Sequence, residues 1–172
     1  MKIKKIFSLL FVVYVTLLDA ETLLVLLKGI EDNHTLHMTY GQKAFVCEPY
    51  GVETVSQLIQ GTDVSTTCMR YLLEFRKANP KEKFYAQEIF HVQQQYSVEG
   101  VDGKCLLNLS SNNSYSEALL ENGYGRIPMT FKYENPVLHE RFKRAVQRAK
   151  NTNAGIWSDT NIRECFLIEK KK

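Results

Sequence analysis

The sequence predicts a mainly β domain with added α-helices, built around a small closed barrel of five short strands. Three observations carry this prediction. Short apolar stretches joined by polar turns open the chain after residue 22, a hairpin signal lies near residue 103, and apolar residues at helical spacing occur between and after these strands. Five strands with a helix between the third and the fourth favour a barrel, which leaves few free edges.

The composition fits a single folded domain. The chain has 172 residues, of which 44% are hydrophobic, and 22 basic against 19 acidic residues give a net charge of +3. This length suffices for one hydrophobic core. The proportions of hydrophobic and charged residues exclude a collagen-like, disordered or multi-pass membrane protein. The net charge is too small to indicate nucleic-acid binding by itself.

Residues 1–20 have the pattern of a signal peptide. Three lysines among the first five residues precede an apolar run from Ile6 to Leu18, and Ala20 offers a small residue for cleavage. This run is shorter than the ~20 residues that cross a bilayer. The alternative is an uncleaved anchor continuing to Leu27, which two acidic residues interrupt. We therefore expect a secreted or periplasmic protein with no stable transmembrane span after signal cleavage.

Four cysteines, at positions 47, 68, 105 and 165, allow three disulfide pairings. The sequence contains neither a Cys-x-x-Cys motif nor a close Cys/His pair, so the cysteine spacing does not indicate a zinc site. Disulfides are favoured if the compartment is oxidising, and buried free thiols are the alternative.

The first three strands are predicted over Leu23–Ile30, Thr35–Tyr40 and Ala44–Cys47. Each is short and rich in apolar residues, and polar turns separate them, so together they form a meander. Residues 48–63 contain one proline and two glycines and are predicted to form an irregular loop.

A helix follows, because Cys68, Tyr71, Leu72 and Phe75 repeat at helical spacing, with Ser65 as its expected cap. Its expected end is Asn79-Pro80. Alternation predicts a strand over Phe84–Tyr96, and the turn around Gly103 pairs it with a last strand over Lys104–Leu109. A short helix is then expected over Tyr115–Asn122, closed by Gly123. The last helix carries one apolar stripe, formed by Leu138, Phe142, Ala145 and Ala149.

Three segments resemble the staphylococcal nuclease (thermonuclease) family. They are Ser116–Ile127, the run Arg141–Ser158 with its Gly155-Ile156-Trp157-Ser158 close, and the turn Asp32–Thr35, which lies where the family has its Asp-Gly-Asp-Thr turn. The resemblance implies an oligonucleotide-binding (OB) barrel with three packed helices over residues 21–160. It leaves 161–172 as a basic C-terminal tail.

The resemblance also implies where a calcium site would lie. Hydrolysis of phosphodiesters in this family uses a calcium ion held by oxygen ligands. The matching positions here are Asp32, His34, Glu53 and Thr54, with His34 standing in place of a metal-binding aspartate. Calcium is the implied cofactor only if this site is retained, and imidazole is a poor calcium ligand. The alternative is that Asp32 and Glu53 are solvated carboxylates of a turn and a loop.

The catalytic positions implied by the resemblance are all altered. Ser56 stands where the family has its general-base glutamate. The first of the family's two phosphate-binding arginines corresponds to Glu48, or to Cys47 if the gap is placed differently. Lys104 keeps the charge of the second arginine without its planar fork. Phe131 takes the place of a tyrosine that stacks on a base. In the family's barrel, Cys47 and Cys105 would be neighbours, and we predict a disulfide between them.

These substitutions favour a degenerate nuclease-like domain that binds nucleic acid or protein. DNA, RNA, or an envelope or secreted protein are the expected partners. The alternative is an active metal-dependent endonuclease with a rearranged site. A third hypothesis is a partner-binding subunit of an envelope assembly.

Overall fold

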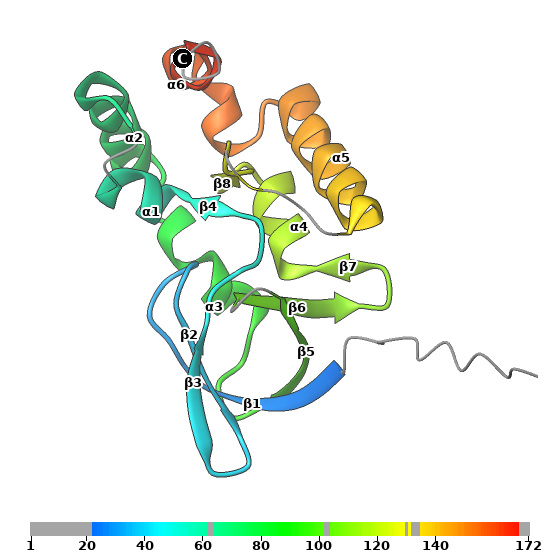
Figure 1. Ribbon diagram of the computed structural model, residues 1–172. Coiled ribbons are helices and arrows are strands. Elements are labelled where there is room, and N and C mark those ends of the chain that lie inside the picture. Colours follow the sequence, from blue (N-terminus) through cyan, green and yellow to red (C-terminus); the bar gives the residue numbers. More distant parts are fainter. Residues whose placement is uncertain (1–21, 62–63, 102–103, 130, 132–134, 169–172) are drawn as a thin grey trace, which may run out of the picture.

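The computed structural model describes residues 22–61, 64–101, 104–129, 131 and 135–168, and it is a mixed α/β fold (Figure 1). The predicted signal peptide, residues 1–20, lies outside the described residues. An antiparallel sheet of six strands forms one end of the molecule, and helices gather at the other (Figure 1). No helix in the described ranges combines the length and the apolar character that crossing a membrane requires.

The sheet has the strand order β3-β2-β1-β5-β6-β7. Its strands are β1 (Thr22–Ile30), β2 (Leu36–Tyr40), β3 (Lys43–Cys47), β5 (Gln95–Val101), β6 (Lys104–Ser110) and β7 (Asn113–Ser114). The predicted meander and the β5–β6 hairpin are therefore present, with antiparallel pairing. A second small sheet pairs β4 (Glu53–Thr54) with β8 (Gly125–Arg126).

The sheet is not the closed five-stranded barrel that we expected. Among the described residues, β3 and β6 are not paired as strands. The chain just beyond β3 instead makes one parallel bridge, between Pro49 and Cys105. Two backbone hydrogen bonds form it: Cys105 N–H donates to the Glu48 carbonyl (2.8 Å), and Tyr50 N–H donates to the Cys105 carbonyl (2.9 Å). Pro49 itself has no N–H to donate, which limits further pairing at this point.

The three predicted helices are present as α2 (Thr66–Ala78), α4 (Tyr115–Glu121) and α5 (Pro136–Thr152). Ser65 caps α2 as expected, by accepting a hydrogen bond from the Cys68 N–H at 3.3 Å. All four residues of the predicted stripe on α5 are buried. Gly123 follows α4 with φ of 65°, and a Cβ there would lie 2.2 Å from the Ala154 carbonyl oxygen, so only glycine fits this close approach.

The loop predicted over residues 48–63 instead contains β4 and the helix α1 (Val55–Gln60). Thr54 and Gln57 form a capping box at the start of α1. This Thr-x-x-Gln spacing was a signal that the sequence carried. Val55 and Leu58 are buried one turn apart, which holds the short helix against its neighbours.

The strand predicted over Phe84–Tyr96 is also wrong for most of its length. Its first part forms η1 (Glu82–Phe84) and α3 (Tyr85–Ile89), and β5 begins only at Gln95. Ala86 and Phe90 are buried while Phe84 is exposed, so the buried spacing is helical rather than alternating.

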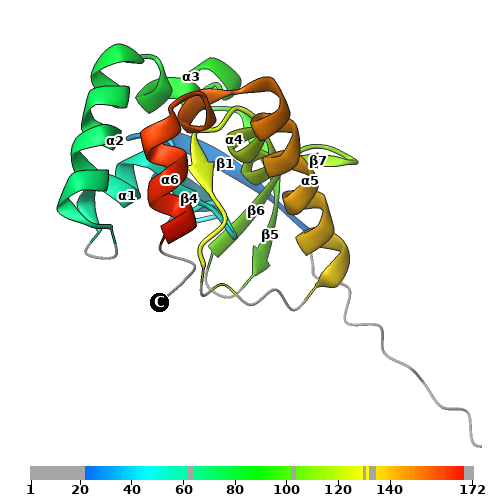
Figure 2. The same cartoon turned by 90° about the horizontal axis from the view of Figure 1, so that it is seen from above.

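The helices form a second hydrophobic core beside the one under the sheet. Helices α2, α5 and α6 (Thr160–Ile168) lie side by side at the end of the molecule away from the β2–β3 hairpin (Figures 1 and 2). Residues 161–168, which we assigned to a basic tail, thus make up most of α6. Ile162, Cys165 and Phe166 are buried at helical spacing, and residues 169–172 lie outside the described part.

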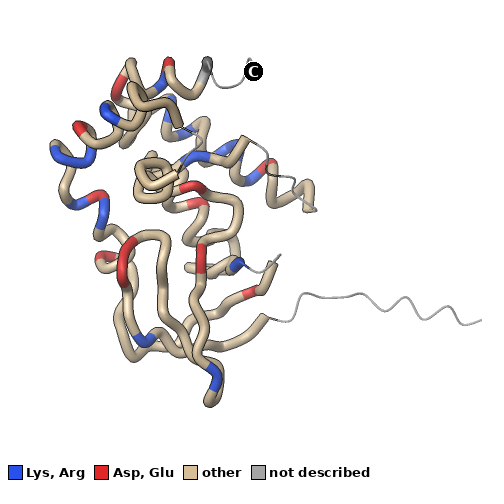
Figure 3. Tube along the Cα trace, turned by 60° about the vertical axis from the view of Figure 1, so that its left-hand side comes forward, with Lys and Arg blue, Asp and Glu red and all other residues tan. Residues whose placement is uncertain are grey.

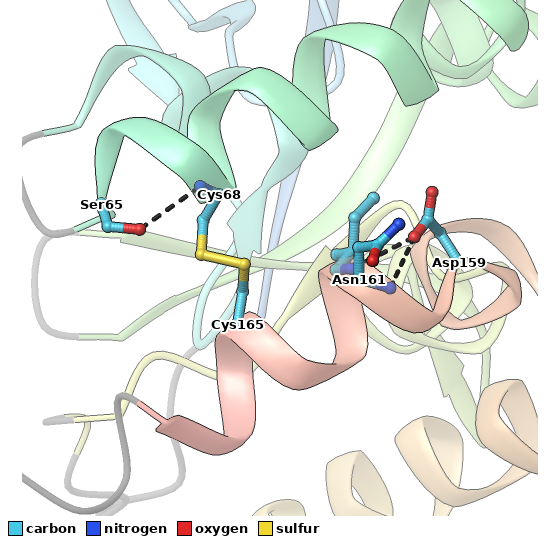
Figure 4. Close-up of a disulfide and its surroundings, with 6 residues drawn as sticks. Ser65, Cys68, Asp159, Asn161 and Cys165 are labelled. Carbon is cyan, nitrogen blue, oxygen red and sulfur yellow. Dashed lines mark hydrogen bonds between the residues drawn. A yellow bond between two sulfur atoms is a disulfide. The ribbon is translucent and has the colours of Figure 1, made fainter.

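A disulfide joins α2 to α6 through Cys68 and Cys165, whose Cα atoms are 5.8 Å apart (Figure 4). The predicted Cys47–Cys105 disulfide is not formed, since both residues are buried free thiols. They are neighbours nonetheless, because the Cys47 thiol donates a hydrogen bond to the Cys105 sulfur. This hydrogen bond, with burial, raises the pKa of Cys47, and it lowers the pKa of Cys105.

Candidate functional site

The turn between β1 and β2 is built by Asp32. Its carboxylate Oδ1 accepts hydrogen bonds from the backbone N–H groups of His34 (2.8 Å) and Thr35 (2.9 Å). An Asx turn of this kind is a structural role that aspartate fills well. One oxygen of the predicted metal ligand is therefore already used to shape the backbone.

Asn33, in the same turn, is fully buried and was missed by the sequence analysis. Its side-chain amide donates to the Glu82 carbonyl and accepts from the Ala86 N–H at 2.8 Å. The Tyr115 hydroxyl donates to the Asn33 carbonyl at 3.1 Å. These bonds tie the β1–β2 turn to η1, α3 and α4, and so fix the position of the neighbouring His34.

Three of the predicted site residues come together from separate parts of the chain. Glu48 Oε2 lies 3.4 Å from His34 Nε2 and 3.5 Å from Lys104 Nζ. His34 belongs to the β1–β2 turn, Glu48 follows β3, and Lys104 begins β6. We call these three residues the His34–Glu48–Lys104 cluster.

The charges of this cluster nearly cancel. Burial, and to a lesser extent Lys104, lower the pKa of His34, although Glu48 and Asp32 act in the opposite direction. The imidazole is therefore largely neutral near pH 7, and Glu48 and Lys104 offset each other. A phosphate at this position would meet one negative and one positive side chain rather than two guanidinium groups.

Gln57 completes the surroundings of His34. Its amide nitrogen lies 3.0 Å from His34 Nε2, while its oxygen accepts a hydrogen bond from the Thr54 N–H at 3.0 Å. The Thr54 hydroxyl accepts in turn from the Gln57 N–H. Thr54, a predicted neighbour of the metal, thus serves as the cap of α1.

Glu53, the predicted metal carboxylate, is bound by an arginine. Arg126 Nε donates to Glu53 Oε2 at 2.9 Å, and the two residues are also paired across β4 and β8. Arg126 is 5% exposed, and its guanidinium lies over the ring of Phe166 at 4.6 Å from the ring centre. The positive charge that a metal ion would supply to Glu53 is provided here by the protein itself.

Ser56, which stands in the general-base position, is also engaged. Arg76 Nη2 donates to its hydroxyl at 2.8 Å, and Arg76 Nε lies 3.5 Å from the Glu82 carboxylate. Ser56 and Glu82 are both buried. Burial raises the pKa of Glu82 to about 7, against the opposing effect of Arg76. This arrangement joins α1, α2 and η1 and has a structural role.

Phe131, the predicted base-stacking residue, packs against the main core. Its half-buried ring meets Tyr50 edge-on, with ring centres 5.0 Å apart. Part of the face that a stacked base would use therefore borders the main core.

Calcium does not fit these residues well. Asp32 shapes a turn, Glu53 is paired with Arg126, and His34 is a nitrogen ligand, whereas calcium requires several oxygen ligands. Within the described ranges, no three His, Cys, Asp or Glu residues are grouped so that they could hold a metal ion. The sequence analysis missed Arg126, Arg76 and Gln57, which are the partners of Glu53, Ser56 and His34. Only the pairing of β4 with β8 reveals the first of them.

The basic face of α5 is largely neutralised by neighbouring acids. Arg141 donates to Glu117 at 2.9 Å and 2.5 Å, and Arg148 donates to Glu121 at 2.8 Å and 3.1 Å. Acidic and basic positions are interspersed at this end of the molecule (Figure 3). A continuous phosphate-binding stripe along this face is therefore not favoured.

No protein-family model and no curated protein matches this chain. The resemblance to staphylococcal nuclease therefore depends on the sequence motifs alone.

Proposed function

We propose that this protein is a staphylococcal-nuclease-like domain with OB-type topology that has lost phosphodiester hydrolysis and acts as a binding module for nucleic acid or protein. Two features of the fold support the topology. The β1–β2–β3 meander is followed by the β5–β6 hairpin, and the bridge from Pro49 to Cys105 brings the end of the meander against β6. Helices α2, α4 and α5 occur in the order that the resemblance implies.

The observation that carries the loss of hydrolysis is the position of Glu48. The motif resemblance places a phosphate-binding arginine there, and Glu48 instead lies between His34 and Lys104. A carboxylate repels the charge that develops on a phosphate in the transition state, where hydrolysis needs fixed positive groups. Removing one donor of this kind typically lowers kcat by about 10²–10³, and replacing it by an anion acts in the same direction.

A location outside the cytoplasm belongs to the same proposal. The Cys68–Cys165 disulfide supports it, because structural disulfides persist mainly in oxidising compartments. The signal-peptide pattern of residues 1–20 agrees with this location.

A plasmid-nicking assay with purified protein tests the loss of hydrolysis. We expect no cleavage of DNA or RNA with Ca²⁺, Mg²⁺, Mn²⁺ or Zn²⁺. Glu53→Ala serves as the site variant, and Glu88→Ala, at an exposed carboxylate on α3, is the matched control. Metal-dependent cleavage that Glu53→Ala abolishes and Glu88→Ala preserves would show an active endonuclease and refute the proposal.

Binding is tested separately, with a fluorescently labelled single-stranded oligonucleotide whose anisotropy is followed against salt concentration. If nucleic acid is the partner, Lys104→Glu should weaken binding and lower the salt dependence, because the cation of the His34–Glu48–Lys104 cluster is lost. Co-purification of a protein without nucleic acid, together with unchanged anisotropy, would instead identify a partner-binding subunit.

A further inference from the structure

The sequence contains three acceptor motifs for N-linked glycosylation, which have the form Asn-x-Ser/Thr with any residue except proline in the middle. They begin at Asn33, Asn108 and Asn112. The oligosaccharide that such a motif accepts is bulky and hydrated, so it is compatible with a folded protein only where the asparagine lies on the surface. The position of each asparagine in the fold therefore decides which motif carries a glycan in the folded protein.

The first motif is closed by the fold. Asn33 is fully buried, and its side-chain amide joins the β1–β2 turn to the Glu82 carbonyl and to the Ala86 N–H. The Tyr115 hydroxyl donates to the backbone carbonyl of the same asparagine at 3.1 Å. An oligosaccharide on the amide nitrogen would have to occupy the space of these neighbours, so a chain modified at Asn33 could not form this turn.

The second motif lies within the sheet. Asn108 is on β6, where it pairs with Ser97 of β5 on one side and with Ser114 of β7 on the other. Its half-buried side chain donates a hydrogen bond from Nδ2 to the Glu99 carboxylate at 3.0 Å. A glycan on this nitrogen would compete with Glu99 for the space beside the strand, so the fold disfavours this motif as well.

The third motif is open to solvent. Asn112 lies in the turn between β6 and β7, and it is exposed. Among the described residues, no hydrogen bond holds its side chain. Figures 1 and 2 show the β6–β7 hairpin at the periphery of the molecule. A sugar on Asn112 would therefore extend into solvent without displacing any of these neighbours.

Ser114 completes this motif and has a second role once the chain has folded. Its buried hydroxyl accepts a hydrogen bond from the Glu117 N–H at 3.3 Å and donates to the Glu117 carboxylate at 2.9 Å, which caps α4. Oligosaccharyltransferase modifies a chain as it is translocated, before this hydroxyl is buried. Ser114 is therefore accessible to the transferase first and becomes the cap afterwards, while the glycan two residues earlier stays outside the core.

We propose that Asn112 accepts an N-linked oligosaccharide in a eukaryotic secretory pathway, and that the folded protein carries a glycan at neither of the other two motifs. The donor is an oligosaccharide joined through its anomeric carbon to a polyprenyl diphosphate. In the transfer, the anomeric C–O bond breaks and the diphosphate leaves with the electron pair. The anomeric carbon forms a C–N bond with Asn112 Nδ2, which releases one proton to solvent. This inference rests on the proposed location outside the cytoplasm and not on the proposed binding role.

The attachment point lies far from the His34–Glu48–Lys104 cluster. Lys104 begins β6 and Ser110 ends it, and a strand rises about 3.3 Å per residue, so the two ends of β6 are about 20 Å apart. The glycan would instead stand beside β7, the last strand in the sheet order. Exposed sheet edges invite pairing with other chains, and a hydrated sugar opposes such pairing. Asn112→Gln should therefore leave the oligonucleotide anisotropy unchanged.

Expression of the full-length chain in cultured mammalian cells tests the proposal. Peptide-N-glycosidase F should increase the gel mobility of the wild-type protein, and peptide mapping should find the glycan at Asn112 alone. Asn112→Gln should abolish the mobility change. Asn113→Gln is the matched control, because it makes the same substitution at the middle position of the motif and leaves the motif intact; it should preserve the glycan. Circular dichroism establishes that each variant is folded.

Protection of the chain from added protease in isolated microsomes reports separately whether it enters the secretory pathway. A protected chain without a glycan at Asn112 would overturn the glycosylation proposal and leave the proposed location intact. A chain that protease digests would refute both. A glycan at Asn33 or Asn108 in the folded, secreted protein would contradict the selection among the three motifs.

Discussion

Arg126 holds Glu53 through a 2.9 Å hydrogen bond from its Nε to the carboxylate, and the same two residues are paired across β4 and β8. The arginine is almost completely buried, while the side chain of Glu53 is 26% exposed. Its guanidinium also packs on Phe166. The position that a calcium ligand would need is therefore part of the protein's own packing.

The first prediction concerns this pair. Arg126→Met should lower the free energy of unfolding by about 2–4 kcal/mol, because it leaves a partly buried carboxylate without its partner. Glu53→Gln should also destabilise, and the double variant should lose less than the sum of the two. Urea denaturation of the four proteins measures this coupling. Additive losses would show that the two side chains do not interact appreciably.

The second prediction concerns His34. Its imidazole pKa should lie below the usual 6.5, because the ring is buried, and Lys104 adds to the effect. Lys104→Met should therefore raise this pKa, whereas Glu48→Gln should lower it further. Titration of the imidazole C–H signals by NMR measures both changes. Lys28→Met, at an exposed lysine on β1, is the control and should leave the His34 titration unchanged.

The third prediction concerns the pH dependence of stability. Burial raises the pKa of Glu82 from 4.5 to about 7, so the folded protein holds this proton more tightly than the unfolded chain does. Between these pH values the folded state binds more protons, and stability from this group is present below pH 4.5 and is lost as pH rises through 7. The loss amounts to about 3.5 kcal/mol at most, since one pKa unit corresponds to about 1.4 kcal/mol.

Glu82→Gln tests this effect, because an amide cannot ionise. Urea denaturation at several pH values between 4 and 8 should give a flatter profile for this variant than for the wild type. Glu88→Gln, at an exposed position on α3, should retain the wild-type slope. If Glu82→Gln and wild type had parallel profiles, ionisation of Glu82 would not differ between the folded and unfolded states.

The fourth prediction concerns the disulfide. Replacing Cys68 and Cys165 together by serine should destabilise the protein by about 2–5 kcal/mol, because a bond spanning 97 residues restricts the unfolded chain strongly. Reductant should lower the Tm of the wild type but not that of this double variant. Non-reducing peptide mapping should recover Cys68 linked to Cys165. Recovery of a peptide joining Cys47 to Cys105 would contradict the pairing described here.

Much of the strand and helix content follows from local patterns. Alternation along β2, the capping serine of α2 and the apolar stripe of α5 are each contained within a few residues, which is why they were predictable. The strand prediction over Phe84–Tyr96 was wrong because the spacing of apolar residues in this segment, taken alone, does not distinguish a strand from a helix. The contacts of Asn33 with Glu82 and Ala86 hold a helical turn there, and these contacts span about fifty residues of chain.

In the candidate site, too, some residues were predictable from the sequence and others only from long-range contacts. Motif resemblance selected His34, Glu48 and Lys104, and the fold brings these three side chains together. The resemblance did not select Arg126, Arg76 or Gln57. Nothing in the local sequence of these residues marks them as the partners of Glu53, Ser56 and His34. Their importance arises from pairing between β4 and β8 and from packing of α1 against α2.

The amino-acid sequence alone determined the order of the strands in the meander, the three main helices and the types of charge near the candidate site. The tertiary structure alone decided that the sheet stays open, that Cys68 bonds to Cys165, and that Glu53 is neutralised by an arginine rather than left available to a metal. The physical reason is range. Periodicity and capping act over a few residues, whereas ion pairing and disulfide formation depend on which distant segments the folded core places within a few ångströms of each other.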